Sequence, residues 1–187
     1  MNLGRLLTHT AALYPEHAAL IQGDETWTWS QINARVNAMA NALRKLGIRK
    51  GDRILLQSRN NIQTFESGWV AFKLGCVWVP TNFRLTPPEV AYLGASSGAV
   101  AMVVEDLFHG HTDAVKAESS TLKHVITIGQ PRAGELDYET LIAQHLGEDF
   151  EGRALVDVHE LAGGQLHDSE ILLALGALLH SRSEEHT

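Results

Sequence analysis

Apolar residues follow two periods along the first 150 residues, one typical of strands and the other of helices. Short, mainly apolar runs are separated by longer segments in which apolar residues recur every three or four positions. The expected strands are residues 18–22, 25–29, 53–58, 76–79, 100–104 and 124–128. The expected helices are residues 30–46, 63–74 and 113–119, one that opens at residues 86–89 and one that follows Asp137.

Turn and cap residues mark the ends of several of these elements. Gly23 and Asp24 join the first two runs into a hairpin, and Ser30 is expected to cap the helix that follows. Gly47 and Gly75 are expected to end helices, because glycine readily adopts the left-handed conformation found there. The helix that Ser30 opens carries one apolar stripe: Ile32, Val36, Met39, Leu43 and Leu46.

Two other helix starts carry stronger signals. Residues 86–89, Thr-Pro-Pro-Glu, fit a capping box with prolines at early helical positions, where a missing N–H costs nothing. Asp137 is expected to cap the last helix, with Leu136 packing onto Leu141 across the cap.

The alternation of strands and helices indicates an α/β fold: a mostly parallel sheet, helices on both faces and an opening β-hairpin. From about residue 154 the pattern changes. Residues 156–160 could form a loop or an edge strand and residues 168–180 an apolar helix, but nothing relates them to the preceding pattern. We therefore divide the chain into residues 1–153 and a poorly defined tail, residues 154–187.

Composition narrows the possible functions. The formal net charge of −7 argues against a nucleic-acid-binding surface. The single cysteine, Cys76, excludes an internal disulfide framework and indicates a reducing compartment. The N-terminus lacks the features of a secretory signal, and the longest apolar stretch, residues 171–179, is far short of the roughly 20 residues of a membrane helix. A cytoplasmic protein without a transmembrane segment is expected.

Residues 94–98, Gly-Ala-Ser-Ser-Gly, fit the G-x-S-x-G pattern of serine hydrolases. That nucleophile needs a strand before the serine and a helix after it, whereas here a helix precedes and a strand follows. A hydrolase that uses Ser96 is therefore the weaker hypothesis, and a helix-to-strand loop of small residues is expected.

Other candidate groups favour structural roles. His109-Gly110-His111, with Asp113 nearby, sets no recognisable zinc geometry, so an exposed polar loop is expected. Cys76 lies in an apolar strand and is expected to be an inert core thiol.

Two further features concern the expected sheet. Glu105 and Asp106 end an expected parallel strand, at the edge where ligands of open α/β sheets bind, but a surface turn is expected there. Phe65, Trp69 and Phe72 are expected to pack a helix against the sheet rather than to line a cofactor site.

The sequence contains no G-x-x-x-x-G-K-[ST] loop and no G-x-G-x-x-G fingerprint. A phosphate cradle needs several backbone N–H groups close to an anion, and glycine permits that approach. We therefore assign no catalytic, cofactor-binding or metal-binding residue to this chain.

Several short segments occur in an informative order: residues 6–15 and 18–21, 28–32 (Thr-Trp-Ser-Gln-Ile), 47–54 (Gly-Ile-Arg-Lys-Gly-Asp-Arg-Ile), Asn60 or Asn61, 73–75 (Lys-Leu-Gly), 79–82 (Val-Pro-Thr-Asn), 84–85 (Arg-Leu) and Glu89. In this order and spacing, residues 3 to about 150 resemble the beginning of an adenylate-forming enzyme of the acyl-CoA synthetase or AMP-binding ligase type.

The resemblance implies a reaction in two steps, with ATP, Mg²⁺ and coenzyme A as cofactors of the full-length enzyme and a carboxylic acid as its substrate. A carboxylate would attack the α-phosphate of ATP, and a thiol would then displace AMP. The family's phosphate loop, adenine motif, hinge aspartate and catalytic lysine are not in this sequence, so no catalytic residue is transferred. Asn82 and Arg84 are expected to stabilise a turn, the alternative being support of the acyl or nucleotide site.

The last six residues, 182–187 (Arg-Ser-Glu-Glu-His-Thr), resemble a translated sequencing adapter. We therefore expect a gene fragment, shifted in frame after about Gly152 and inactive by itself. An incomplete sheet would leave apolar surface exposed and favour self-association. The alternative is a natural, non-catalytic module that reuses this subdomain for small-molecule binding or assembly. The sequence leaves the acyl substrate open.

Overall fold

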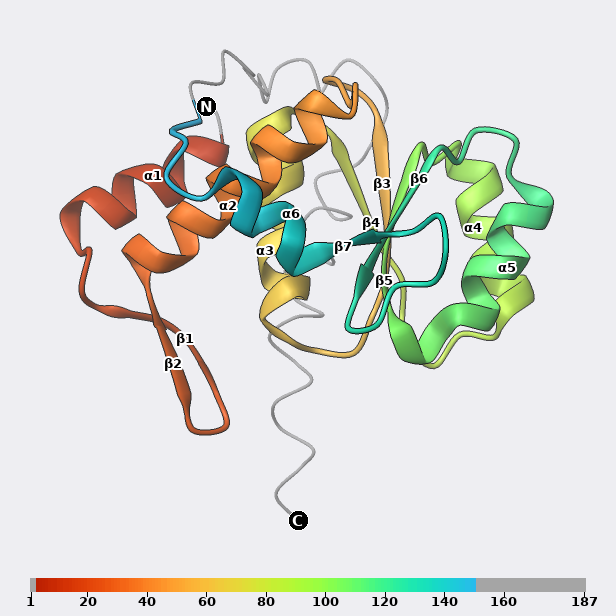
Figure 1. Ribbon diagram of the computed structural model, residues 1–187, viewed down its shortest axis with the longest axis horizontal. Coiled ribbons are helices and arrows are strands. Elements are labelled where there is room, and N and C mark those ends of the chain that lie inside the picture. The colour runs from red at the N-terminus through yellow and green to blue at the C-terminus, as the bar shows by residue number, and fades with distance from the viewer. Residues whose placement is uncertain (1–2, 151–187) are drawn as a thin grey trace, which may run out of the picture. The chain divides into compact units, whose positions relative to one another are not determined.

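The computed structural model describes residues 3–150, which belong to one unit. The expectations for residues 154–187, including the helix at 168–180 and the adapter-like end, lie outside the described residues. The helices are α1 (Leu3–Leu13), α2 (Trp29–Lys45), α3 (Ile62–Leu74), α4 (Pro87–Ser97), α5 (His109–Glu118) and α6 (Tyr138–His145). The strands are β1 (Ala18–Gln22), β2 (Glu25–Thr28), β3 (Arg53–Gln57), β4 (Val77–Pro80), β5 (Ala101–Glu105), β6 (His124–Ile128) and β7 (Leu136–Asp137), and η1 (Asp106–Phe108) is a short 3-10 helix (Figure 1).

The expected architecture is confirmed. Five parallel strands form one sheet in the order β4-β3-β5-β6-β7, and β1 pairs with β2 as a separate antiparallel hairpin. The sequence pattern did not reveal β7, because its two residues are too few to show a period of two.

Helices cover both faces of the sheet (Figure 1). Alternate residues of β3 point to opposite sides: Ile54 and Leu56 join the core beneath α1, α2, α3 and α6, whereas Leu55 joins the core beneath α4 and α5. All five residues of β5 are buried. A parallel sheet needs helices on both faces to exclude water from strands as apolar as these.

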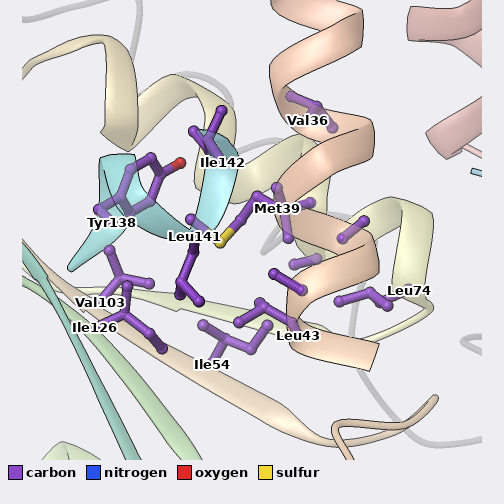
Figure 2. Packing of buried hydrophobic residues seen from close by; sticks show 14 of the residues in the cluster. Val36, Met39, Leu43, Ile54, Leu74, Val103, Ile126, Tyr138, Leu141 and Ile142 are labelled. Carbon is purple, nitrogen blue, oxygen red and sulfur yellow. The ribbon is translucent and has the colours of Figure 1, made fainter. Parts of the chain in front are cut away.

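The larger core lies between α2 and the sheet. Figure 2 shows Met39 and Leu43 of α2 directed toward Ile54 of β3, with Leu141 of α6 closing the gap between them. Burying a side chain of this size contributes about 1.5–3 kcal/mol to stability. The apolar stripe predicted for α2 is confirmed from Ile32 to Leu43, while the last member of that stripe is only partly buried.

Two predicted helix starts are wrong. Thr28, rather than Ser30, caps α2: its side chain accepts from the Gln31 N–H, and the Gln31 side chain accepts from the Thr28 N–H at 2.8 Å. α5 begins at His109, four residues before the expected start, because η1 leads directly into it. The prediction that Asp137 caps α6 is confirmed, since its carboxylate accepts from the Thr140 N–H at 2.7 Å.

Glycine permits the close contact between α4 and α5. A Cβ added to Gly94 would lie 2.8 Å from Cγ1 of Val115, a fully buried residue of α5. A Cβ added to Gly110, also helical, would meet nothing within 4 Å.

Gly94→Ala should therefore force α4 and α5 apart and lower the free energy of unfolding by about 1–3 kcal/mol. Gly110→Ala is the matched control and should be neutral or stabilising by up to about 1 kcal/mol, since alanine favours helix. Urea denaturation followed by circular dichroism measures both changes. Equal effects at the two positions would contradict the packing argument.

Charged groups are also buried beneath the helices. Arg35 of α2 donates to Glu66 of α3 (Nη2 to Oε2, 3.1 Å) and to Glu139 of α6 (Nη1 to Oε2, 2.8 Å). The Tyr138 hydroxyl donates to Glu66 at 3.2 Å. Glu66 is completely buried, and burial, only partly offset by Arg35, raises the pKa of its carboxyl. This network ties three helices together over one face of the sheet.

Lys73 of α3 forms a second buried polar cluster and is 5% exposed. Its ammonium donates to Thr8 Oγ1 of α1 at 2.9 Å, to Asn33 Oδ1 of α2 at 2.7 Å and to Asn37 Oδ1 of α2. Burial lowers the pKa of Lys73 from 10.5 to about 8, against a small opposing effect of Asp149.

Because the pKa of Lys73 is lower in the folded protein, the unfolded chain binds more protons between pH 8 and 10.5. Stability should therefore rise with pH over this range. Relative to Lys73→Met, which cannot titrate, the wild type should gain up to about 3 kcal/mol. Urea titrations of both proteins at the two ends of the range measure this, and a constant difference between them would contradict the burial of an uncompensated ammonium.

Candidate functional site

The connections of the sheet diverge at one place. The chain leaving β3 enters α3 on one face, whereas the chain leaving β5 passes through η1 into α5 on the other face. Because β3 and β5 are neighbours, their carboxyl ends lie side by side at the point where the two connections diverge. Ligands of open α/β sheets bind at such a topological switch point, so this edge is the candidate site.

An ion pair joins the ends of these two strands. Glu105, the last residue of β5, is 8% exposed and faces Arg59, which follows β3. Arg59 Nε donates to Glu105 Oε1 at 3.0 Å, and the Arg59 backbone N–H donates to Oε2 at 3.0 Å. The Ser58 hydroxyl adds a longer bond of 3.4 Å. Burial alone would raise the pKa of Glu105, but the bonds from Arg59 outweigh burial and hold the pKa below its ordinary value.

The adjoining N-terminus of α3 is already satisfied by side chains. Asn61 caps it by accepting from the Thr64 N–H at 2.8 Å, and Gln22 of the hairpin accepts from the Ile62 N–H at 3.0 Å. A phosphate at this helix end would have to displace both partners.

The expectation of a surface turn at Glu105 and Asp106 is wrong for Glu105, which is a buried strand residue. Asp106 lies in η1 and accepts from the Gln130 N–H at 2.9 Å. Sequence reasoning missed Arg59 because its partner is 46 residues away. A usable signal was available: each residue of the pair lies at the end of an apolar run expected to be a parallel strand.

The turn after β4 follows the sequence-based interpretation. Asn82 Oδ1 accepts from the Arg84 N–H at 2.9 Å, and the Arg84 guanidinium lies 5.2 Å from the centre of the Phe83 ring. Both contacts stabilise the local turn.

Ser96 cannot be a hydrolase nucleophile of the elbow type. It lies in the last turn of α4, where its hydroxyl donates to the Leu93 carbonyl at 3.4 Å, and β5 follows rather than precedes it. The small residues around it form the end of this helix rather than the expected loop, and Gly98 provides the left-handed cap.

The histidine pair is not the expected loop, because His109 and His111 belong to the first turn of α5. One nitrogen of His111 bonds the Leu85 carbonyl at 2.8 Å. Among residues 3–150 no group of three or more His, Cys, Asp or Glu side chains could hold a metal ion. Burial raises the pKa of the Cys76 thiol to about 12, which leaves it unreactive as expected.

The aromatic residues of α3 form edge-to-face pairs: Phe65 with Trp69 at 6.2 Å and Trp69 with Phe72 at 5.9 Å between ring centres. Phe65 and Trp69 pack on the larger core, as expected. All three rings remain partly exposed, because Val70 and Ala71 take the most buried positions of the helix.

Comparison with known proteins identifies this architecture. The family model described as AMP-binding enzyme matches residues 7–162. The 3-oxocholest-4-en-26-oate–CoA ligase of Rhodococcus rhodochrous is 29% identical over 171 residues, which are 88% of this chain and 31% of the relative. Long-chain-fatty-acid–CoA ligase FadD13 of Mycobacterium tuberculosis is 34% identical over 120 residues, 63% of this chain and 24% of the relative.

Solved structures agree with the sequence comparisons. The anthranilate CoA ligase AuaEII has a TM-score of 0.74 at 26% identity, covering 78% of this chain and 28% of that protein. A benzoate CoA ligase from Burkholderia xenovorans LB400 has a TM-score of 0.72 at 26% identity, covering 83% and 30%.

The described residues thus have the fold of the N-terminal domain of adenylate-forming ligases, a five-stranded parallel sheet with a preceding hairpin. The chain belongs to the AMP-binding enzyme family. It spans less than a third of the length of the curated relatives named above. In the part of the chain that the structure describes, no helix is long and apolar enough to cross a membrane.

The Arg59–Glu105 ion pair should make the stability of the fold depend on pH in the acid range. The folded-state pKa of Glu105 lies below the ordinary 4.5, so the carboxylate stabilises the fold above that pH and loses this effect as the pH falls. The wild type should therefore exceed Glu105→Gln in stability at pH 7, by a margin that shrinks toward pH 3. Urea titrations measure the margin.

The control is Glu118→Gln, at an exposed position of α5, which should match the wild type at pH 7. A Glu105→Gln protein as stable as the wild type at pH 7 would show that the pair contributes nothing to the fold.

Proposed function

We propose that residues 3–150 form the first α/β unit of an ATP-dependent carboxylate–CoA ligase. In this reaction a carboxylate attacks the α-phosphate of ATP and releases pyrophosphate, and the thiol of coenzyme A then displaces AMP from the acyl-adenylate. The family match supports the proposal, as do relatives whose names specify steroid, long-chain fatty acid, benzoate and anthranilate CoA ligases. The proposed substrate is a carboxylic acid, with no particular acyl group assigned.

Within this ligase the described unit serves as scaffold. The observation that carries this conclusion is the Arg59–Glu105 ion pair, which joins the ends of β3 and β5 at the switch point. The neighbouring end of α3 is capped by Asn61 and Gln22, and residues 3–150 contain no cluster that could hold Mg²⁺. These residues therefore do not fit ATP or its metal by themselves, and we infer that the chain is inactive alone.

Exposed apolar side chains support self-association of this unit. Residues such as Leu13, Ile21, Tyr92 and Leu107 are each more than half exposed. Large apolar residues on a surface favour contacts with other protein surfaces. We keep the cytoplasm as the expected compartment, since the thiol of Cys76 is free and buried.

A chimera tests the proposal. Residues 3–150 would replace the matching part of long-chain-fatty-acid–CoA ligase FadD13, and acyl-CoA formation from ATP, coenzyme A and a long-chain fatty acid would be measured. The chimera should be active, and the purified 187-residue chain should not exceed a heat-inactivated sample. Ser96→Ala in the chimera is the control and should leave kcat unchanged, because no serine chemistry is proposed.

Two results would count against the proposal. ATP-dependent acyl-CoA formation by the 187-residue chain alone would show that it carries its own reacting groups. A chimera that folds, as judged by circular dichroism, but has no activity would show that this unit cannot serve as the ligase scaffold.

A further inference from the structure

A hollow of about 290 Å³ lies between α1, α2 and the segment that follows α6. It shares no residue with the Arg59–Glu105 ion pair at the switch point. Small side chains, including Ala11 and Ala34, line part of it, while polar residues from two different segments form two further walls. Asn33 and Asn37 belong to one wall, and Glu148 and Asp149 to the other.

The wall on α2 is oriented by the buried ammonium behind it. A protonated lysine can only donate, so Asn33 and Asn37 must both turn their carbonyl oxygens toward Lys73. Their amide nitrogens then point away from Lys73, and within residues 3–150 neither amide nitrogen has an acceptor. Since both residues line the hollow, this wall offers N–H donors, backed by a positive charge that no carboxylate of the described residues contacts.

The wall formed by the segment that follows α6 carries negative charge. Glu148 is already paired, because Lys45 Nζ lies 3.1 Å from its Oε1. Asp149 is exposed, and among the described residues no side chain donates to its carboxylate. Its negative charge nevertheless favours the protonated form of Lys73 and so raises the pKa of that ammonium. The two walls therefore have opposite polarity.

We propose that this hollow binds a small zwitterion of the amino acid class, with its carboxylate on Asn33 and Asn37 and its ammonium on Asp149. A carboxylate accepts hydrogen bonds from the two amides and is attracted by Lys73 behind them. An ammonium at the other end gives Asp149 the partner that the described residues do not supply. The small alanine side chains of the hollow, including Ala11 and Ala34, leave room for a side chain. This proposal does not depend on the proposed ligase function.

The test uses the full chain and three matched probes in NMR titrations: L-leucine, 4-methylpentanoate, which lacks the ammonium, and 3-methylbutylamine, which lacks the carboxylate. Leucine should shift resonances of α1, α2 and residues 147–149, and each analogue should bind at least about fivefold more weakly, as expected for loss of one partly exposed charge contact. No shift at about 50 mM leucine, or equal binding of the three probes, overturns the proposal.

Two variants test which residues bind the two ends of the ligand. Asp149→Asn should abolish the preference for leucine over 4-methylpentanoate, whereas Asp24→Asn, in the exposed hairpin turn, should leave it intact. Asn37→Asp keeps an oxygen for Lys73 but removes the amide donors, and should weaken leucine binding in a chain whose spectrum remains folded. If Asn37→Asp fails to fold, Asp149→Asn decides: an unchanged preference overturns the proposal.

Discussion

Burial of both faces of the parallel sheet is the constraint on which the rest of the structure depends. β5 has no exposed residue, and adjacent residues of β3 belong to opposite cores. The chain must therefore send helices to each side, and these helices must lie close enough to exclude water. Gly94 meets this demand between α4 and α5, where the contact with Val115 leaves no space for a methyl group.

The same demand explains the buried charges. α3 carries two buried charged residues where it packs against other helices, so Glu66 and Lys73 can be accommodated only with partners from those helices. Arg35 supplies the partner for Glu66, and three neutral oxygens surround the ammonium of Lys73. An unpaired group at either position would cost several kcal/mol, roughly the whole stability margin of a small domain. These contacts therefore fix how the helices pack.

Local sequence signals predicted where helices and strands lie better than they predicted which residues of different elements bond to one another. Runs such as residues 124–128 and the caps at Gly75 and Asp137 were predictable because each depends on neighbours within a few residues. The cap of α2 was misplaced because Thr28, Ser30 and Gln31 all favour helix starts, and only the reciprocal bonds of Thr28 decide between them. Only part of the candidate site could be predicted. The position of Glu105 at a strand end followed from the strand pattern, whereas its pairing with Arg59 depends on strand order.

The long reach of Arg35 has a consequence for how the protein is made. Its partner Glu139 comes 104 residues later, and β3 pairs with β5, the central strand of the sheet, nearly fifty residues along the chain. Contacts of such separation form slowly, because a long loop must close before any of them stabilises the chain. During synthesis Arg35 can pair with Glu66 once α3 has left the ribosome, whereas its second partner, Glu139, arrives only with α6. Folding of this unit is accordingly a late event, because α6 can pack against α2 only after the residues from Tyr138 onward have been made.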